Sequence, residues 1–155
     1  MKKEINFKKL CEYKKVDSFG QSLKNCDVIV PERNSKNCWN RYYLNIIGEY
    51  KFMITFENNL ANGIVTEKIY NAFMGNTLPI YWGNAEINKH FNKDSFINYH
   101  DYNTDEEVIN FIKKIDTDDE LYYKMLNSQK LHANSQDYYR NQYKNIWKNV
   151  LFNFN

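Results

Sequence analysis

The heptapeptide FMITFEN, residues 52–58, decides the fold, because it joins a buried strand to two polar side chains. Its first five residues are apolar except for one threonine, a pattern typical of a strand covered by helices on both faces of a parallel sheet. Glu57 and Asn58 follow where this strand ends. A buried polar group without a partner costs roughly 1–3 kcal/mol, so both side chains need partners. Open α/β sheets bind ligands at the carboxyl ends of their strands, and we expect a site here.

The next block, GIVTEK at residues 63–68, predicts the start of a helix. Thr66 is a favourable N-cap, so Glu67 and Lys68 fall in the first helical turn. Apolar residues at helical spacing continue as far as Gly75, a typical helix stop. The run LPIYW, residues 78–82, then predicts a second strand. This order of strand, helix and strand favours an α/β fold with a parallel sheet.

Lys68 is the unusual residue of that first turn. The helix dipole favours the carboxylate of Glu67 there but disfavours a cation by about 0.3–1 kcal/mol. An anionic ligand would remove the conflict, because backbone N–H groups, the dipole and a lysine together form a phosphate site. The alternative is that Lys68 bends away into water, and the spacing alone favours this alternative. Because the lysine opposes the dipole, Lys68→Ala is expected to leave the stability of the fold nearly unchanged.

Several blocks together resemble the C-terminal, donor-binding part of the α-1,3/4-fucosyltransferases, glycosyltransferase family ten. The family signature has a strand ending in Phe-Glu-Asn, a helix start Gly-aromatic-Val-Thr-Glu-Lys and a strand Pro-Ile-Tyr-Trp-Gly. This chain carries FEN at 56–58, GIVTEK at 63–68 and PIYWG at 79–83. Further similar segments are YKKVD at 13–17, SFIN at 95–98 and HDY at 100–102. The similarity extends roughly over residues 3–112.

The resemblance implies a Rossmann-like parallel sheet with flanking helices, one lobe of a GT-B architecture. Residues 1–155 would form a single domain that binds GDP-fucose, and fucose would be transferred with inversion to a hydroxyl of a glycan acceptor. Neither a cofactor nor a metal ion is implied. Carried over by position, Lys68 would meet the pyrophosphate, and Asn58 and Glu67 would contact the ribose or the sugar. Lys3 falls near a phosphate-binding arginine of the family and keeps its charge but not its bidentate fork.

The sequence departs from the family pattern in three ways. Ile64 replaces the usual aromatic residue, and Phe19 replaces the first of two glycines. The family also carries an N-terminal acceptor lobe that supplies the catalytic carboxylate, whereas these residues begin near the donor lobe. We therefore expect the acceptor lobe to be absent here, through fragmentation or because a separate chain supplies it. The catalytic base is unknown.

Two other functions remain open on the same grounds. One is a non-catalytic module that binds nucleotide sugars, which the missing base favours. The other is an interaction protein that keeps only the fold and uses an apolar stripe predicted on a final helix at residues 139–154. A face of this kind must be buried or must recruit a partner.

Composition excludes several classes of protein. The net charge is +2, too close to neutral for an electrostatic case for nucleic-acid or membrane binding. No apolar run approaches the ~20 residues of a membrane span, and the first residues lead into no signal-peptide core. Three scattered cysteines do not form a disulfide or metal framework. These features weakly favour a cytoplasmic location.

The remaining segments predict short elements. Residues 4–11 and 39–47 read as helices, while Val16 and residues 28–30 suggest short strands. Two Thr-x-x-Glu capping boxes, at Thr104 and Thr117, predict two further helices. Residues 116–118 read Asp-Thr-Asp, which resembles a glycosyltransferase metal motif, but the second capping box explains it locally. The three histidines share no spacing and read as loop residues.

Overall fold

The computed structural model describes residues 2–19, 23–29, 39–58, 65–132 and 135. Its centre is a parallel sheet of three strands in the order β1-β2-β3. The strands are β1 Phe52–Phe56, β2 Leu78–Trp82 and β3 Ile97–Asn98. The predicted α/β class with a parallel sheet and flanking helices is confirmed, and both predicted strands have the predicted bounds.

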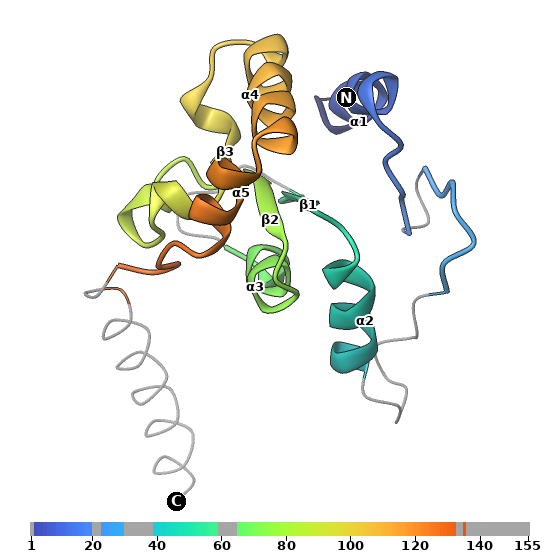
Figure 1. Ribbon diagram of the computed structural model, residues 1–155, viewed down its shortest axis with the longest axis horizontal. Helices are drawn as coiled ribbons and strands as arrows, with labels where there is room; N and C mark the ends of the chain where they lie inside the picture. The colour runs from blue at the N-terminus through green and yellow to red at the C-terminus, as the bar shows by residue number, and fades with distance from the viewer. Residues whose placement is uncertain (1, 20–22, 30–38, 59–64, 133–134, 136–155) are drawn as a thin grey trace, which may run out of the picture.

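Helices cover both faces of the sheet (Figure 1). The α-helices are α1 Lys2–Tyr13, α2 Trp39–Gly48, α3 Glu67–Met74, α4 Asp105–Thr117 and α5 Asp119–Leu126. Within the described ranges, three 3-10 helices lie at Ile87–Lys89, Lys93–Ser95 and Tyr99–Asp101. The helices predicted at 4–11 and 39–47 are therefore confirmed. In the described part of the chain, no helix is long and apolar enough to cross a membrane.

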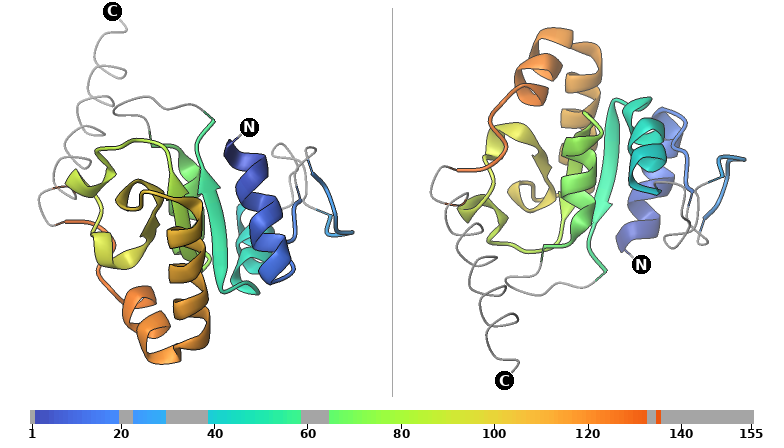
Figure 2. Two further views of the ribbon diagram at one scale, coloured as in Figure 1. Left: turned by 90° about the horizontal axis from the view of Figure 1, so that it is seen from above. Right: turned by 90° about the horizontal axis from the view of Figure 1, so that it is seen from below.

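The two faces of the sheet bury separate cores. Leu78 and Ile80 of β2 pack with apolar side chains of α4 and α5 on one face. Tyr81 points to the other face, where it packs with Ile69 of α3 and with Phe91. Alternation along β2 therefore assigns α4 and α5 to one layer and α3 to the other, as the two views in Figure 2 also show.

The pairing register places the ends of β1 and β2 level with each other. Phe52 lies opposite Leu78, and Phe56 lies opposite Trp82. One residue further, the N–H of Glu57 donates to the carbonyl of Trp82 at 2.8 Å. The first polar residue after β1 is thus held directly beside the turn that follows β2.

The strands predicted at Val16 and at residues 28–30 are wrong for the described residues, because Val16, Val28 and Ile29 lie outside any strand. The side chain of Asn25 takes the place of a neighbouring strand: its Nδ2 donates to the carbonyl of Val16 at 2.8 Å. Ile29 is 76% exposed and packs in no core. Residue 30, most of the loop predicted at 31–40 and the helix predicted at 139–154 lie outside the described residues.

The first capping box is confirmed for its threonine, although its glutamate accepts from the N–H of Asn103 and not of Thr104, and the second box is wrong. Thr104 Oγ1 accepts from the N–H of Glu107 at 3.2 Å, which starts α4. Thr117, however, is the last residue of α4, and its hydroxyl donates back to the carbonyl of Lys113 at 3.0 Å. Asp118 caps α5 instead, by accepting from the N–H of Leu121 at 2.9 Å. The aspartate prevails because the threonine is still inside the preceding helix.

Gly75, which was predicted to end α3, does end it, and the reason for a glycine here is close packing. Gly75 is the C-cap, but the left-handed residue is Asn76, with φ of 55°. A Cβ on Gly75 would lie 2.7 Å from Cγ2 of Ile47 in α2. Gly75 therefore lets α2 approach the end of α3.

Candidate functional site

The centre of the site is the carboxylate of Glu57, which is 2% exposed. Its Oε1 accepts from the N–H of Thr66 at 2.8 Å. Its Oε2 accepts from the hydroxyl of Thr66 at 2.7 Å and from Nζ of Lys68 at 3.1 Å. A single buried carboxylate thus fastens the end of β1 to the start of α3 and satisfies its own need for donors.

Thr66 occupies the predicted N-cap position but does not act as a side-chain cap. Its backbone is extended, with φ of −93° and ψ of −178°, and its side chain makes no cap hydrogen bond. Its hydroxyl donates to Glu57. The first turn of α3 therefore begins without an acceptor from its own N-cap, which suits an anion at this helix end.

Gly83 makes the room that Glu57 occupies. A Cβ at this position would lie 2.5 Å from Cγ of Glu57 and 2.6 Å from the hydroxyl oxygen of Tyr81. Tyr81 is fully buried, and its hydroxyl accepts from the N–H of Asn84 at 3.0 Å. Gly83 and Asn84, the first residues after β2, are therefore buried against the carboxylate.

A histidine holds the same turn from its outer side. Nε2 of His100 lies 2.9 Å from the carbonyl oxygen of Gly83, and the ring stacks on Trp82 with centroids 6.3 Å apart. His100 was predicted only as a loop histidine. It lies in the 3-10 helix after β3, so the ends of all three strands contribute to this corner.

Lys68 does not extend freely into water, so the alternative favoured by its spacing is wrong. Its side chain is 27% exposed and forms an ion pair with Glu57. Nζ also lies 3.5 Å from Oδ1 of Asn58, at the long end of a hydrogen bond. This changes the expectation for Lys68→Ala, because removal of the lysine takes a cation away from a buried carboxylate.

A cavity of about 770 Å³ opens beside this corner. Glu67 and Lys68 line one end of it, and Lys14 and Asp116 line it elsewhere. The structure therefore brings three predicted residues together: Lys68 with Asn58, and Glu67 beside Lys68 on the cavity wall. The fourth, Lys3, has its backbone in α1, and its side chain lies outside the described part, as does residue 64.

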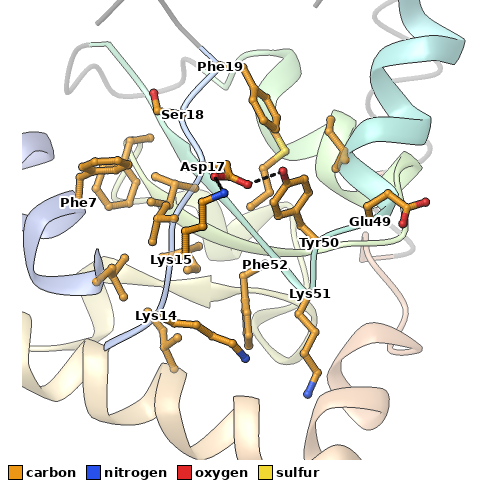
Figure 3. Close-up of a pocket in the computed structure, with 18 of the residues that line it drawn as sticks. Phe7, Lys14, Lys15, Asp17, Ser18, Phe19, Glu49, Tyr50, Lys51 and Phe52 are labelled. Carbon is orange, nitrogen blue, oxygen red and sulfur yellow. Dashed lines mark hydrogen bonds and ion pairs between the residues drawn. The ribbon is translucent and has the colours of Figure 1, made fainter. Parts of the chain in front are cut away.

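A second polar cluster crosses the cavity, and sequence reasoning did not assign it a role (Figure 3). The hydroxyl of Tyr50 donates to Oδ2 of Asp17 at 2.8 Å, and Nζ of Lys15 lies 2.8 Å from Oδ1. The hydrogen bond and charge of Lys15 lower the pKa of Asp17. Burial, helped by the bond to Asp17, raises the pKa of Tyr50 to about 12. The feature of the sequence that could have indicated this cluster is Asp17, the aspartate of the YKKVD segment.

The two aspartates of the Asp-Thr-Asp segment serve separate structural contacts. Asp118 caps α5, whereas Oδ2 of Asp116 accepts from the hydroxyl of Tyr13 at 3.0 Å and from Nζ of Lys14 at 2.9 Å. Burial raises the pKa of Asp116, but the bonds from Lys14 and Tyr13 outweigh it and hold the pKa below its usual value. Asp116 therefore fastens the end of α1 to α4.

Comparison with known proteins identifies the family. Residues 1–149 match the family model described as glycosyltransferase family 10 (fucosyltransferase), C-terminal part. An alpha-(1,3)-fucosyltransferase of Helicobacter pylori is 41% identical over 87 residues, which cover 56% of this chain and 18% of that protein. The GDP-fucose protein O-fucosyltransferase 3 of Homo sapiens is 29% identical over 116 residues, which cover 74% of this chain and 24% of that protein.

Solved structures agree with this. A crystal structure of an α1,3-fucosyltransferase with GDP-fucose aligns with a TM-score of 0.69 and 33% identity over 81% of this chain and 34% of that one. The same kind of enzyme with GDP aligns with a TM-score of 0.70 and 31% identity. The chain spans about a fifth to a quarter of the curated relatives and about a third of the solved structures. It belongs to glycosyltransferase family 10, the fucosyltransferases, and corresponds to the C-terminal part of that family.

Proposed function

We propose that this chain is the donor-binding part of an inverting fucosyltransferase and binds GDP-fucose in the corner formed by Glu57, Thr66 and Lys68. One observation carries the proposal. Among the described residues, Nζ of Lys68 meets only the acceptors Oε2 of Glu57 and Oδ1 of Asn58, and the lysine side chain stays 27% exposed. A diphosphate can therefore reach this ammonium group without any rearrangement of the sheet.

Two positively charged groups of the site can bind the diphosphate. The N-terminal end of α3 carries a partial positive charge, and Thr66 does not cap it with its side chain. Lys68 adds a full charge within the first turn. Together they stabilise the negative charge that grows on the diphosphate as it leaves the sugar, which is a common source of catalytic power. Glu67 and Asn58 are assigned to the ribose or the fucose.

The reaction that fits this site is a single displacement. A hydroxyl of the acceptor attacks the anomeric carbon while the bond from that carbon to the diphosphate oxygen breaks on the opposite face. The transition state has oxocarbenium character, as in glycoside hydrolysis. The hydroxyl proton goes to a general base. Glu57 is unsuited to this role because its two oxygens already accept three hydrogen bonds, so we assign the base to the acceptor-binding part of the enzyme.

Calorimetric titration of the 155-residue chain with GDP, GDP-fucose and UDP tests the proposal. GDP and GDP-fucose are expected to bind with similar affinity and UDP more weakly. All three ligands carry a diphosphate, but UDP has uracil in place of guanine. Equal affinity for GDP and UDP, or no binding of any of the three, would contradict a donor site selective for GDP-fucose.

A further inference from the structure

One edge of β1 faces no strand among the described residues. β1 pairs with β2, and the hydrogen bonds at its two ends show which backbone groups this pairing uses. The carbonyl of Lys51 accepts from Leu78, and the N–H of Glu57 donates to Trp82. Because backbone groups alternate along a strand, the odd-numbered residues 51–57 face β2. The N–H and C=O groups of Phe52, Ile54 and Phe56 therefore face away from β2.

The two helical layers continue past this open edge. α1 packs beside α4 on one face, and α2 packs beside α3 on the other. Both helices stand beyond β1 in Figure 1 and in the two views of Figure 2. Phe7 and Leu10 of α1, and Tyr43 and Ile47 of α2, line the cavity between them. The layers thus enclose a space in the plane of the sheet, next to its last strand.

The far wall of this space is residues 14–19. The carbonyl of Val16 and the N–H of Ser18 bond to the side chain of Asn25 on the outer side. Lys15 and Asp17, which alternate with these residues, line the cavity. The side chains of Tyr50 and Asp17 meet across it (Figure 3). The open edge of β1 and residues 14–19 therefore line the same cavity.

The volume of the cavity matches one short strand. Five residues at a rise of about 3.3 Å, with a strand spacing of about 4.8 Å and layers about 10 Å apart, occupy on the order of 800 Å³. The cavity measures about 770 Å³. Its β1 wall is apolar and only half-buried at Phe52, Met53 and Ile54, whereas the first four residues of β2 are fully buried.

We propose that this cavity is a slot for one additional β-strand, apolar and about five residues long, from the polypeptide that carries the acceptor-binding part of the enzyme. The apolar walls select apolar side chains, and the open edge of β1 supplies backbone hydrogen bonds, as in recognition by strand addition. The source of the strand rests on the proposed function. About two thirds of the solved fucosyltransferase chain has no counterpart in this sequence. Parallel to β1, the strand ends beside Lys68 and completes the donor corner.

Amide hydrogen exchange of the 155-residue chain, followed by NMR, tests the slot. The probe is an acetylated, amidated peptide with the sequence Lys-Lys-Val-Thr-Val-Ile-Val-Lys-Lys. Without peptide, the amides of Phe52, Ile54 and Phe56 should exchange faster than those of Met53 and Thr55. Saturating peptide should slow the first three by at least about tenfold and leave the other two almost unchanged.

Three results would overturn the proposal. Slow exchange at all five amides without peptide, at every protein concentration, would mean that another part of this chain fills the slot. Slow exchange that appears only as the protein concentration rises would mean that a second copy fills it. Fast exchange at Phe52, Ile54 and Phe56 that saturating peptide does not change would mean that the slot binds no strand.

Two variants and a GDP titration sharpen the test. Ile54→Pro removes an N–H that faces the slot and should abolish protection by the peptide, whereas Ile54→Val should retain it. Phe7→Asp, which leaves β1 unchanged, should also abolish it. GDP binding without peptide protection would overturn the slot and leave the proposed function intact. Peptide protection in a chain that binds no GDP would overturn the proposed function and the assigned source of the strand.

Discussion

Nζ of Lys68 lies 3.1 Å from Oε2 of Glu57, so the cation that we propose to bind the donor is paired with a buried carboxylate. This pairing resolves the conflict between the lysine and the dipole of α3. It also keeps the lysine ordered at the cavity, which lowers the entropic cost of binding a diphosphate. Glu57 therefore serves both the fold and the site.

The first prediction concerns Glu57. Glu57→Gln should lower the free energy of unfolding by about 1–3 kcal/mol, because the amide cannot accept all three hydrogen bonds and leaves Lys68 without its counter-ion. The measurement is urea unfolding at pH 7. Glu86→Gln, which removes a half-exposed carboxylate paired with Lys89, is the matched control and should change stability by less than about 1 kcal/mol. Equal effects of the two variants would show that Glu57 is not a structural anchor.

The second prediction concerns Gly83. Gly83→Ala should destabilise the fold by about 1–3 kcal/mol and weaken GDP binding, because its Cβ would overlap Glu57 and the Tyr81 hydroxyl. Gly48→Ala is the control, since its Cβ meets one carbonyl oxygen at 3.2 Å. Thermal unfolding and calorimetry report the two quantities. A Gly83→Ala protein as stable as Gly48→Ala would contradict the close packing described for Glu57.

Much of this architecture could be predicted from local signals. The run at 52–56 gave the bounds of β1, because five apolar or β-branched residues between polar segments fit only a short buried strand. The strand end and the helix start also pointed to the candidate site, since both lie at the carboxyl edge of the sheet. The role of Glu57 could not be predicted. It depends on the space left by Gly83, which follows β2 and is distant from Glu57 in the sequence.

The wrong predictions have physical causes of the same kind. Residues 16 and 28–30 have strand-like side chains, but Asn25 satisfies the backbone near Val16, and no strand forms. Thr117 fits a capping box by spacing, yet α4 continues through it and Asp118 takes over the cap. In both places a tertiary or neighbouring contact overrides the local pattern.

The third prediction concerns acid stability. The folded-state pKa of Asp116 lies below its value in the unfolded chain, so its contribution is complete above about pH 4 and is lost as the pH falls through the folded pKa. Asp116→Asn should therefore reduce stability at pH 7 and flatten the loss of stability below pH 4. Asp94→Asn, at an exposed position, is the control. Chemical unfolding from pH 7 to pH 2.5 gives both curves, and parallel curves for the Asp116→Asn and wild-type proteins would exclude this linkage.

The fourth prediction is that the 155-residue chain alone transfers fucose very poorly or not at all. General-base catalysis is typically worth about 10²–10⁴-fold, and the positioning of the acceptor contributes more. Neither is available from the donor corner. The chain is incubated with GDP-fucose and N-acetyllactosamine, and the products are followed by mass spectrometry. Slow hydrolysis of GDP-fucose agrees with the prediction, whereas robust transfer would require a base within these 155 residues.

The last prediction is that Lys68 binds the diphosphate and not the nucleoside. Lys68→Met should weaken GDP binding by about 1.5–3 kcal/mol, the scale of a charge-assisted hydrogen bond, and leave guanosine binding unchanged. The same substitution should cost some stability, since it removes the partner of Glu57. Lys89→Met, at an exposed lysine distant in the sequence from α3, should change neither affinity.

The most direct measurement is calorimetry of the wild-type and Lys68→Met proteins, each titrated with GDP and with guanosine. A donor site at the start of α3 predicts a loss confined to GDP. An equal loss for both ligands, or an unchanged affinity for GDP, would contradict the assignment of Lys68 to the diphosphate and with it the proposed donor site.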